Sequence, residues 1–257
     1  MALFETLSDD GYTIPKAQIL FKESGGDTYE ILGDADDVTL EMNVEETDRF
    51  TNEEGIRKLA KTIVTQIDPR LAMTLVHLSD RNRSLALLGL LEYVTQTAAP
   101  GETFNIVDAE HGGKLYKLPH IMLTNVVVED GSAVPYVLNT NYRIDTDNGI
   151  IQLITPPLGA DGDVVIDYDA AAVVAGDLKA KIKVGASTST RGAMIIRGTN
   201  DVGKQVSLYL HDVQLRPSAG RAYISETDLA TVEIEGRVFV DDTQPAGLEL
   251  GYELANG

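Results

Sequence analysis

Several short stretches carry residue types that could do chemistry, and the sharpest is a near match to a phosphate-binding loop. The segment Gly198 to Gln205 reads Gly-Thr-Asn-Asp-Val-Gly-Lys-Gln, whereas nucleotide-binding loops read G-x-x-x-x-G-K-[ST] and open a helix. Gln205 stands where a hydroxyl would hold magnesium, and an alternating strand follows in place of the helix whose N-terminus would receive the phosphates. The segment is therefore interpreted as a turn between strands.

A second candidate is Asp145-Thr-Asp-Asn-Gly149, whose oxygen-rich side chains suit calcium. An EF-hand loop has Gly at its sixth position and a bidentate Glu at its twelfth, whereas here Gly is fifth and Pro156 is twelfth. A hairpin turn of the Asn-Gly type accounts for the same residues. Adventitious calcium at this turn stays an open alternative.

The remaining side chains that could do chemistry are scattered. The chain has no Cys, so it has no thiol nucleophile, disulfide or thiolate metal site. The histidines His77, His111, His120 and His211 have no second His at ligand spacing, and Ser187 lacks the closing Gly of a nucleophile elbow. With no Trp, a sugar-stacking platform is also disfavoured. We expect no catalytic residue, no cofactor and no metal site, and hence a protein that is not an enzyme.

The most regular pattern in the chain is the alternation from Asp37 to Glu45. The apolar members are Val38, Leu40, Met42 and Val44, and every residue between them is polar or acidic. Because successive side chains of a strand point to opposite faces, the pattern predicts a strand with one buried face and one anionic face.

Charge is distributed unevenly around this strand. Fifteen acidic against three basic residues in the first 55 positions account for −12 of the formal net charge of −19. Positions 56 to 100 carry six basic and three acidic residues. The overall charge disfavours binding of a phosphate backbone, which needs Lys and Arg to displace counterions. No apolar run approaches the ~20 residues of a membrane-spanning helix, so no membrane partner is expected.

Most of the remaining sequence also predicts strands. A polar loop at 46–55 should join the acidic strand to a long return strand at 57–67, which breaks at Asp68-Pro69 and resumes at 71–78. One helix should begin at the N-cap Ser79, with apolar residues at helical spacing as far as Val94. We expect a β core formed by 1–100 and 177–257, with a small β-meander at 101–176 inserted in it or appended to it.

The order of these features resembles the major tail tube proteins of tailed bacteriophages over roughly residues 33–241. The segments that carry the resemblance are Asn82-Arg-Ser-Leu-Ala-Leu-Leu-Gly89, Asn141-Tyr-Arg-Ile-Asp145 with Asn148-Gly-Ile150, Asp212-Val-Gln-Leu-Arg-Pro217 and Glu233-Ile-Glu-Gly-Arg-Val238. Asn141 stands where that family usually has an acidic residue.

The resemblance implies a mainly β subunit, a β-sandwich or barrel with one flanking α-helix. Six subunits would form a hexameric ring whose lumen is a β-barrel, and stacked rings would form the tail tube through which genomic DNA passes without specific binding. The implied location is the virion tail, assembled in the host bacterial cytoplasm. The implied partners are further copies of the chain and the tape measure, terminator and distal tail proteins.

Two sets of charged residues are the candidate functional residues. Asp37, Glu41 and Glu45 are expected to line the lumen, because an anionic wall repels phosphates. Ring stacking is expected to pair acidic hairpin tips with a basic rim that also includes Arg81 and Arg83. The stacking residues are Glu46, Asp48, Arg49, Glu53, Glu54, Arg57, Lys58 and Lys61.

Two other functions remain open. The tube of a contractile injection or type VI secretion system would share the architecture but carry proteins, and the acidic strand and the inserted meander favour the phage tail instead. A β-sandwich adhesin or carbohydrate-binding module would not assemble. Electron microscopy of the purified protein separates the assembling classes from the last.

Overall fold

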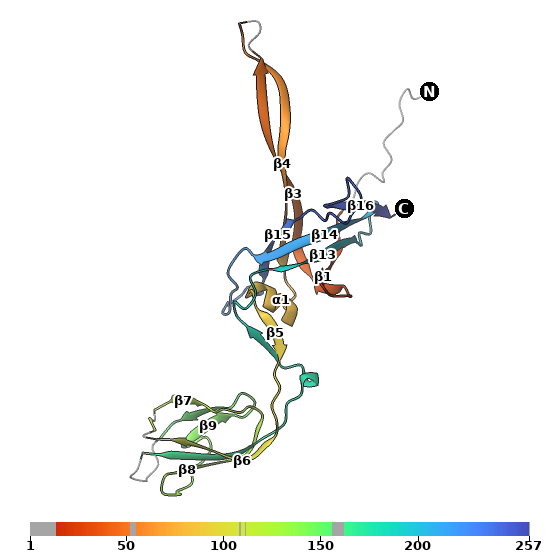
Figure 1. The fold of residues 1–257 in the computed structure, drawn as a ribbon. Helices are drawn as coiled ribbons and strands as arrows, with labels where there is room; N and C mark the ends of the chain where they lie inside the picture. The colour runs from red at the N-terminus through yellow and green to blue at the C-terminus, as the bar shows by residue number, and fades with distance from the viewer. Residues whose placement is uncertain (1–13, 52–54, 108, 111, 156–161, 257) are drawn as a thin grey trace. The chain divides into compact units, whose positions relative to one another are not determined.

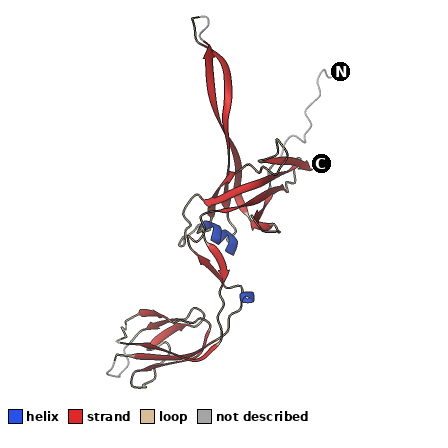
Figure 2. Cartoon of the chain, viewed as in Figure 1, coloured by secondary structure: helices blue, strands red, loops and turns tan. Residues whose placement is uncertain are grey.

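The computed structural model describes residues 14–51, 55–107, 109–110, 112–155 and 162–256. Strands make up 55% of the described residues, and for these residues the expectation of a mainly β protein with one α-helix is confirmed (Figures 1 and 2). The elements in chain order are β1 (Ala17–Glu23), β2 (Glu30–Gly33), β3 (Ala35–Thr51), β4 (Lys58–Leu75), α1 (Asp80–Ala86), β5 (Leu90–Tyr93), β6 (Ala99–Ile106), β7 (Lys114–Lys117), β8 (Leu123–Asp130), β9 (Tyr142–Asp145), β10 (Ile150–Leu153), β11 (Val164–Ala170), a 3-10 turn (Ala175–Asp177), β12 (Ala180–Lys183), β13 (Thr190–Gly198), β14 (Gln205–Pro217), β15 (Val232–Val238) and β16 (Gly251–Asn256).

The chain divides into two compact units. Unit 1 comprises Met1–Leu91 and Ile182–Gly257, and unit 2 comprises Glu92–Lys181. The expected insert at 101–176 thus lies within a longer segment. β5 and β12 pair with each other where the chain leaves unit 1 and returns to it, so the two ends of the insert lie side by side.

Unit 1 is built on an eight-stranded antiparallel sheet in the order β2-β1-β13-β14-β15-β4-β3, with β16 paired to β14. β15 shows how sequence sets the two faces: Val232, Ile234 and Val238 are buried, and Glu233 and Glu235 between them are exposed. The buried residues join a core with Phe21, Leu71, Met194 and Leu215.

β2 and β3 are the two outer strands of this sheet. No sheet formed by the described residues closes into a barrel. A barrel within the single subunit, one of the two forms expected from the sequence, is therefore not what this chain adopts. The outer strands instead leave main-chain donors and acceptors available for pairing with another chain.

The helix α1 begins as expected and ends earlier than expected. The Ser79 hydroxyl accepts a hydrogen bond from the Asn82 amide at 3.2 Å, which confirms the predicted N-cap. The helix ends at Ala86, and Leu88 takes a positive φ of 45°. A Cβ at Gly89 would lie 2.3 Å from Ile182 Cγ2, so the chain turns at this glycine to pair β5 with β12. The expected helical run to Val94 is wrong for that reason.

Asn82 fixes the helix to the sheet. Its side chain is fully buried, and its Nδ2 donates to the carbonyl oxygens of Leu32 at 2.5 Å and His77 at 2.6 Å. Leu85 on the same helix belongs to the core cluster of unit 1. The helix is thus packed against the sheet, as its apolar residues indicate.

Unit 2 contains two three-stranded sheets, ordered β7-β10-β9 and β6-β11-β8. Residues from both sheets, among them Ile151, Leu153, Val164 and Ile166, share one core cluster. In these sheets only β9 and β10 are consecutive neighbours, so the expected meander is wrong. Two stacked sheets bury the alternating apolar residues of both, which a single three-stranded meander would leave exposed.

Candidate assembly surface

The β3–β4 hairpin extends far beyond the rest of its sheet (Figure 1). β15 accompanies β4 only from Arg70 to Leu75, whereas β3 pairs with β4 from Ala35 to Thr51. Beyond Arg70 the hairpin is therefore a ribbon of two strands. A two-stranded ribbon is marginally stable alone in water, so its length and composition call for an explanation.

Two sequence expectations for this hairpin need correction. The predicted break at Asp68-Pro69 is absent, because Pro69 pairs with Met42 in a continuous strand. Pro69 lies one residue past the last pair with β15, where β4 has only one neighbour and a missing N–H is tolerated. The predicted loop at 46–55 is also too long, because β3 continues to Thr51. Residues 52–54 lie outside the described residues.

One face of the ribbon is apolar and exposed, although the alternation predicts a buried face for Met42 and Val44, because no strand of the described chain covers it beyond unit 1's core. It begins inside the core of unit 1, where Val38 lies opposite Met73 and Leu40 opposite Leu71. It then continues along the ribbon as side chains that are 44–56% exposed. These are Met42, Val44, Phe50, Leu59, Val64 and Ile67, which we call the apolar face.

Cross-strand pairing places these six residues on one side, which Glu46 and Asp48 share with them. Val44 lies opposite Ile67, Phe50 opposite Leu59, and Glu46 opposite Val64. Covering the exposed half of each such side chain contributes about 1 kcal/mol. Single exposed apolar residues are normal on a protein surface, whereas a group of six along one face indicates a contact with another protein.

The opposite face is acidic. Asp37, Glu41 and Glu45 all lie on it and all are exposed, which is the arrangement that their alternation with Val38 to Val44 predicts. Arg70 lies opposite Glu41, and its guanidinium is paired with Asp68 at 3.0 Å. Because Arg70 is paired with Asp68, the carboxylates of Asp37, Glu41 and Glu45 leave this face negatively charged along the part of β3 that they span.

The residues expected to stack rings separate along the ribbon. Glu46 lies opposite Val64, and Asp48 accepts a hydrogen bond from the Thr62 hydroxyl at 2.7 Å. Past Asp48, every charged residue that the structure describes on this hairpin is basic. These are Arg49 opposite Lys61, Lys58 opposite Thr51, and Arg57, whose guanidinium lies 5.1 Å from the Phe50 ring centre. Glu53 and Glu54 lie outside the described residues.

The two arginines beside the helix that were expected in the basic rim have acidic partners within the subunit. Arg81 is paired with Glu23 and Glu30, each at 3.2 Å, and Arg83 with Asp80 at 3.0 Å. Arg81 thus joins α1 to β1 and β2 within one subunit, whereas Arg83 is paired inside α1 itself. The ion pairs of Arg81 could not be predicted from the sequence, because its acidic partners are more than 50 residues away in the chain.

Both sequence motifs that resembled binding loops are turns between strands. Gly198 ends β13 and Gln205 begins β14, and between them Asn200 Nδ2 donates to three carbonyl oxygens of the same turn, the nearest being that of Val202 at 2.8 Å. The turn interpretation of the near match to a phosphate loop is confirmed.

Asp145 likewise accepts hydrogen bonds from the Asn148 amide at 3.1 Å and from its side chain at 2.7 Å, which hold its pKa below the usual range. In the described part of the chain, no three His, Cys, Asp or Glu side chains are grouped as metal ligands would be.

Fold and surface together define a mainly β protein of two units, one of which carries a long hairpin with two unlike faces. The chain belongs to the family described as "Protein of unknown function UCP028589", whose model matches residues 18–252. No curated protein matches the chain. None of the helices described is long and apolar enough to cross a membrane.

Proposed function

We propose that this protein is the structural subunit of a phage tail tube. Copies join through the β3–β4 hairpin into hexameric rings, and the rings stack into a tube whose lumen is a continuous β-barrel. The observation that carries the proposal is the hairpin itself, which has an apolar face continuous with the core and an acidic face opposite to it.

Each face has one role in such an assembly. The apolar face is covered by a neighbouring subunit, since water is a poor environment for a row of half-exposed large side chains. The acidic face, with Asp37, Glu41 and Glu45, is left to line the lumen. A lumen of this charge repels DNA phosphates and lets the genome pass without binding.

The open sheet of unit 1 supports the same proposal. β3 is an outer strand with a long unpaired edge, and β2 is the outer strand on the other side. Contacts between unlike edges of identical subunits are heterologous, and they close into a ring when the rotation between neighbours allows it. Pairing of such edges around a ring would remove the exposed edges from every subunit.

The assembled tube would reside in the virion tail, formed in the bacterial cytoplasm, with tape measure, terminator and distal tail proteins as its partners. The test is electron microscopy of the purified full-length protein over a range of concentrations. Hollow tubes or six-membered rings are the expected result. Monodisperse monomers at every concentration would overturn the proposal and favour an adhesin or carbohydrate-binding module.

A further inference from the structure

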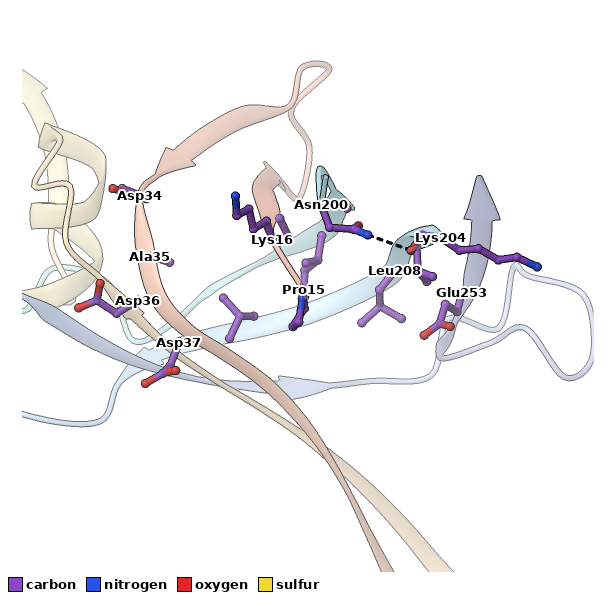
Figure 3. Close-up of a pocket in the computed structure, with 15 residues that line it drawn as sticks. Pro15, Lys16, Asp34, Ala35, Asp36, Asp37, Asn200, Lys204, Leu208 and Glu253 are labelled. Atoms are coloured by element: carbon purple, nitrogen blue, oxygen red, sulfur yellow. Dashed lines mark hydrogen bonds between the residues drawn. The ribbon is translucent and has the colours of Figure 1, made fainter. Parts of the chain in front are cut away.

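A pocket of about 670 Å³ lies in unit 1 between strands of its large sheet. The starts of β1, β3 and β14, the end of β13, and β16 surround it (Figure 3). Its interior is apolar, and Ala35 and Leu208 point into the space between their strands (Figure 3). The other apolar residues that line it are Val38, Ile196 and Val206. Val38, Ile196 and Leu208 also pack against the core, so the pocket is an open end of that core.

The rim of this pocket is anionic. Asp34, Asp36 and Asp37 stand on the β3 side with their carboxylates directed away from the interior, and Glu253 stands across from them on β16 (Figure 3). Two lysines also line the pocket, but Lys16 is paired with Asp201 at 3.0 Å, and the side chain of Lys204 extends away from the pocket (Figure 3). An apolar ligand flanked by positive charge would fit both the interior and the rim.

The far end of the hairpin has that composition. Ile56 is 71% exposed and Leu59 is 56% exposed. Arg57, Lys58 and Lys61 are interleaved with them, and no acidic residue occurs from 55 to 61, although Glu53 and Glu54 precede this segment in the sequence. The segment thus presents two large apolar side chains with three cations around them.

The hairpin end cannot reach the pocket of its own subunit. Val38 of the pocket and Phe50 beside Leu59 lie on the same strand β3, which is continuous between them. At ~3.3 Å per residue, the separation along this strand is about 40 Å. The occupant must therefore come from a second copy of the chain.

We infer that Ile56–Lys61 of one subunit docks in this pocket of a second subunit. Ile56 and Leu59 enter the apolar interior, and the three cations meet Asp34, Asp36 and Glu253 of the rim. The contact joins two different surfaces of the same chain, so it is heterologous and can recur from copy to copy around a ring or along a tube. The inference rests on the proposed self-assembly and adds to it which two surfaces meet.

The absence of Cys from the sequence permits a direct test by disulfide trapping. The variant with Leu59→Cys and Leu208→Cys is assembled and then oxidised, and linked species are counted on a non-reducing gel. Linkage requires Cα atoms within about 7 Å. The matched control combines Leu59→Cys with Leu115→Cys, because Leu115 is 66% exposed and lies in unit 2. We expect ladders of linked subunits from the first pair and none above background from the second.

A charge exchange provides a second readout that does not depend on new cysteines. Lys58→Glu with Lys61→Glu should slow assembly about tenfold, because rim charges chiefly set the rate of encounter. Adding Asp36→Lys with Glu253→Lys should restore most of the lost rate. Tubes that form without Leu59–Leu208 linkage and without rescue would overturn this inference alone. An unmodified chain that forms no rings or tubes would instead overturn the proposed function.

Discussion

Ile63 and Val64 are neighbours on β4, yet they face opposite sides of the hairpin: Ile63 lies across from Thr47 on the acidic side, and Val64 across from Glu46 on the apolar side. Their exposures are similar, at 45% and 51%. The contribution of each face to assembly can therefore be measured separately, by making the same substitution at Ile63 and at Val64.

Val64→Asp should abolish or strongly reduce assembly, whereas Ile63→Asp should be tolerated. The first places a charge in the contact that covers the apolar face, where an unpaired buried charge is costly. The second adds one more carboxylate to a face that is already acidic. Sedimentation velocity on the two variants and the parent measures the effect. Equal loss of assembly in both would show that the two faces are not functionally distinct.

Replacing Asp37, Glu41 and Glu45 together by Lys should leave ring formation intact but slow DNA ejection. The three side chains are exposed and outside the apolar face, and cations at these positions of the proposed lumen would hold DNA phosphates. Ejection triggered in vitro and followed by release of DNA fluorescence gives the rate. Wild-type kinetics in virions that carry the triple substitution would argue against a lumen role.

Assembly in vitro should slow as salt rises from low to moderate concentration. Each exposed ion pair contributes at most about 1 kcal/mol and is screened, but the contact between the basic hairpin end and an anionic partner recurs in every subunit. Arg57→Glu with Lys58→Glu should favour free subunits or single rings, as light scattering and electron microscopy would show. Indifference to salt and to both reversals would mean that apolar contacts alone drive stacking.

Unit 2 should lose stability between about pH 10 and pH 12 through Tyr136. This side chain is 7% exposed, and burial, followed by the charge of Asp130, raises its pKa to about 12. A folded-state pKa above the ordinary value of 10.0 means that the contribution of Tyr136 to stability is constant below pH 10 and falls as pH rises toward 12. Tyr136→Phe should flatten part of this decline relative to the parent, in urea titrations followed by circular dichroism. Identical pH profiles would exclude Tyr136 as a source.

Much of unit 1 was predictable because local pattern and tertiary environment agree. The alternation from Val38 to Val44 placed the three carboxylates on one face of a strand, and Ser79 marked the start of the helix. The helix end was not predictable from spacing, because Leu90 and Leu91 continue a helical pattern while pairing with β12 holds them in a strand. That pairing involves residues some 90 positions away in the chain, which apolar periodicity does not report.

Among the candidate surfaces, too, features set by local sequence were predictable and features set by long-range pairing were not. The acidic face of the hairpin follows from period-two alternation within β3 alone. The ion pairs of Arg81 and the pocket beside Ala35 depend instead on strands that are distant in sequence and adjacent only in the folded sheet. The apolar residues of β4 were visible in the sequence, but the extra residue Thr65 in β4 shifts the register and decides that Val64, and not Ile63, joins the apolar face.

The orientation of the hairpin in an assembled tube tests the central claim most directly. A cryo-electron microscopy reconstruction of tubes grown from the full-length protein would locate β3 in each subunit. The account predicts six subunits per ring, with Asp37, Glu41 and Glu45 facing the lumen and Met42, Val44 and Val64 covered by a neighbouring subunit. Tubes with these carboxylates on their outer surface, or with the apolar face left in contact with solvent, would contradict it.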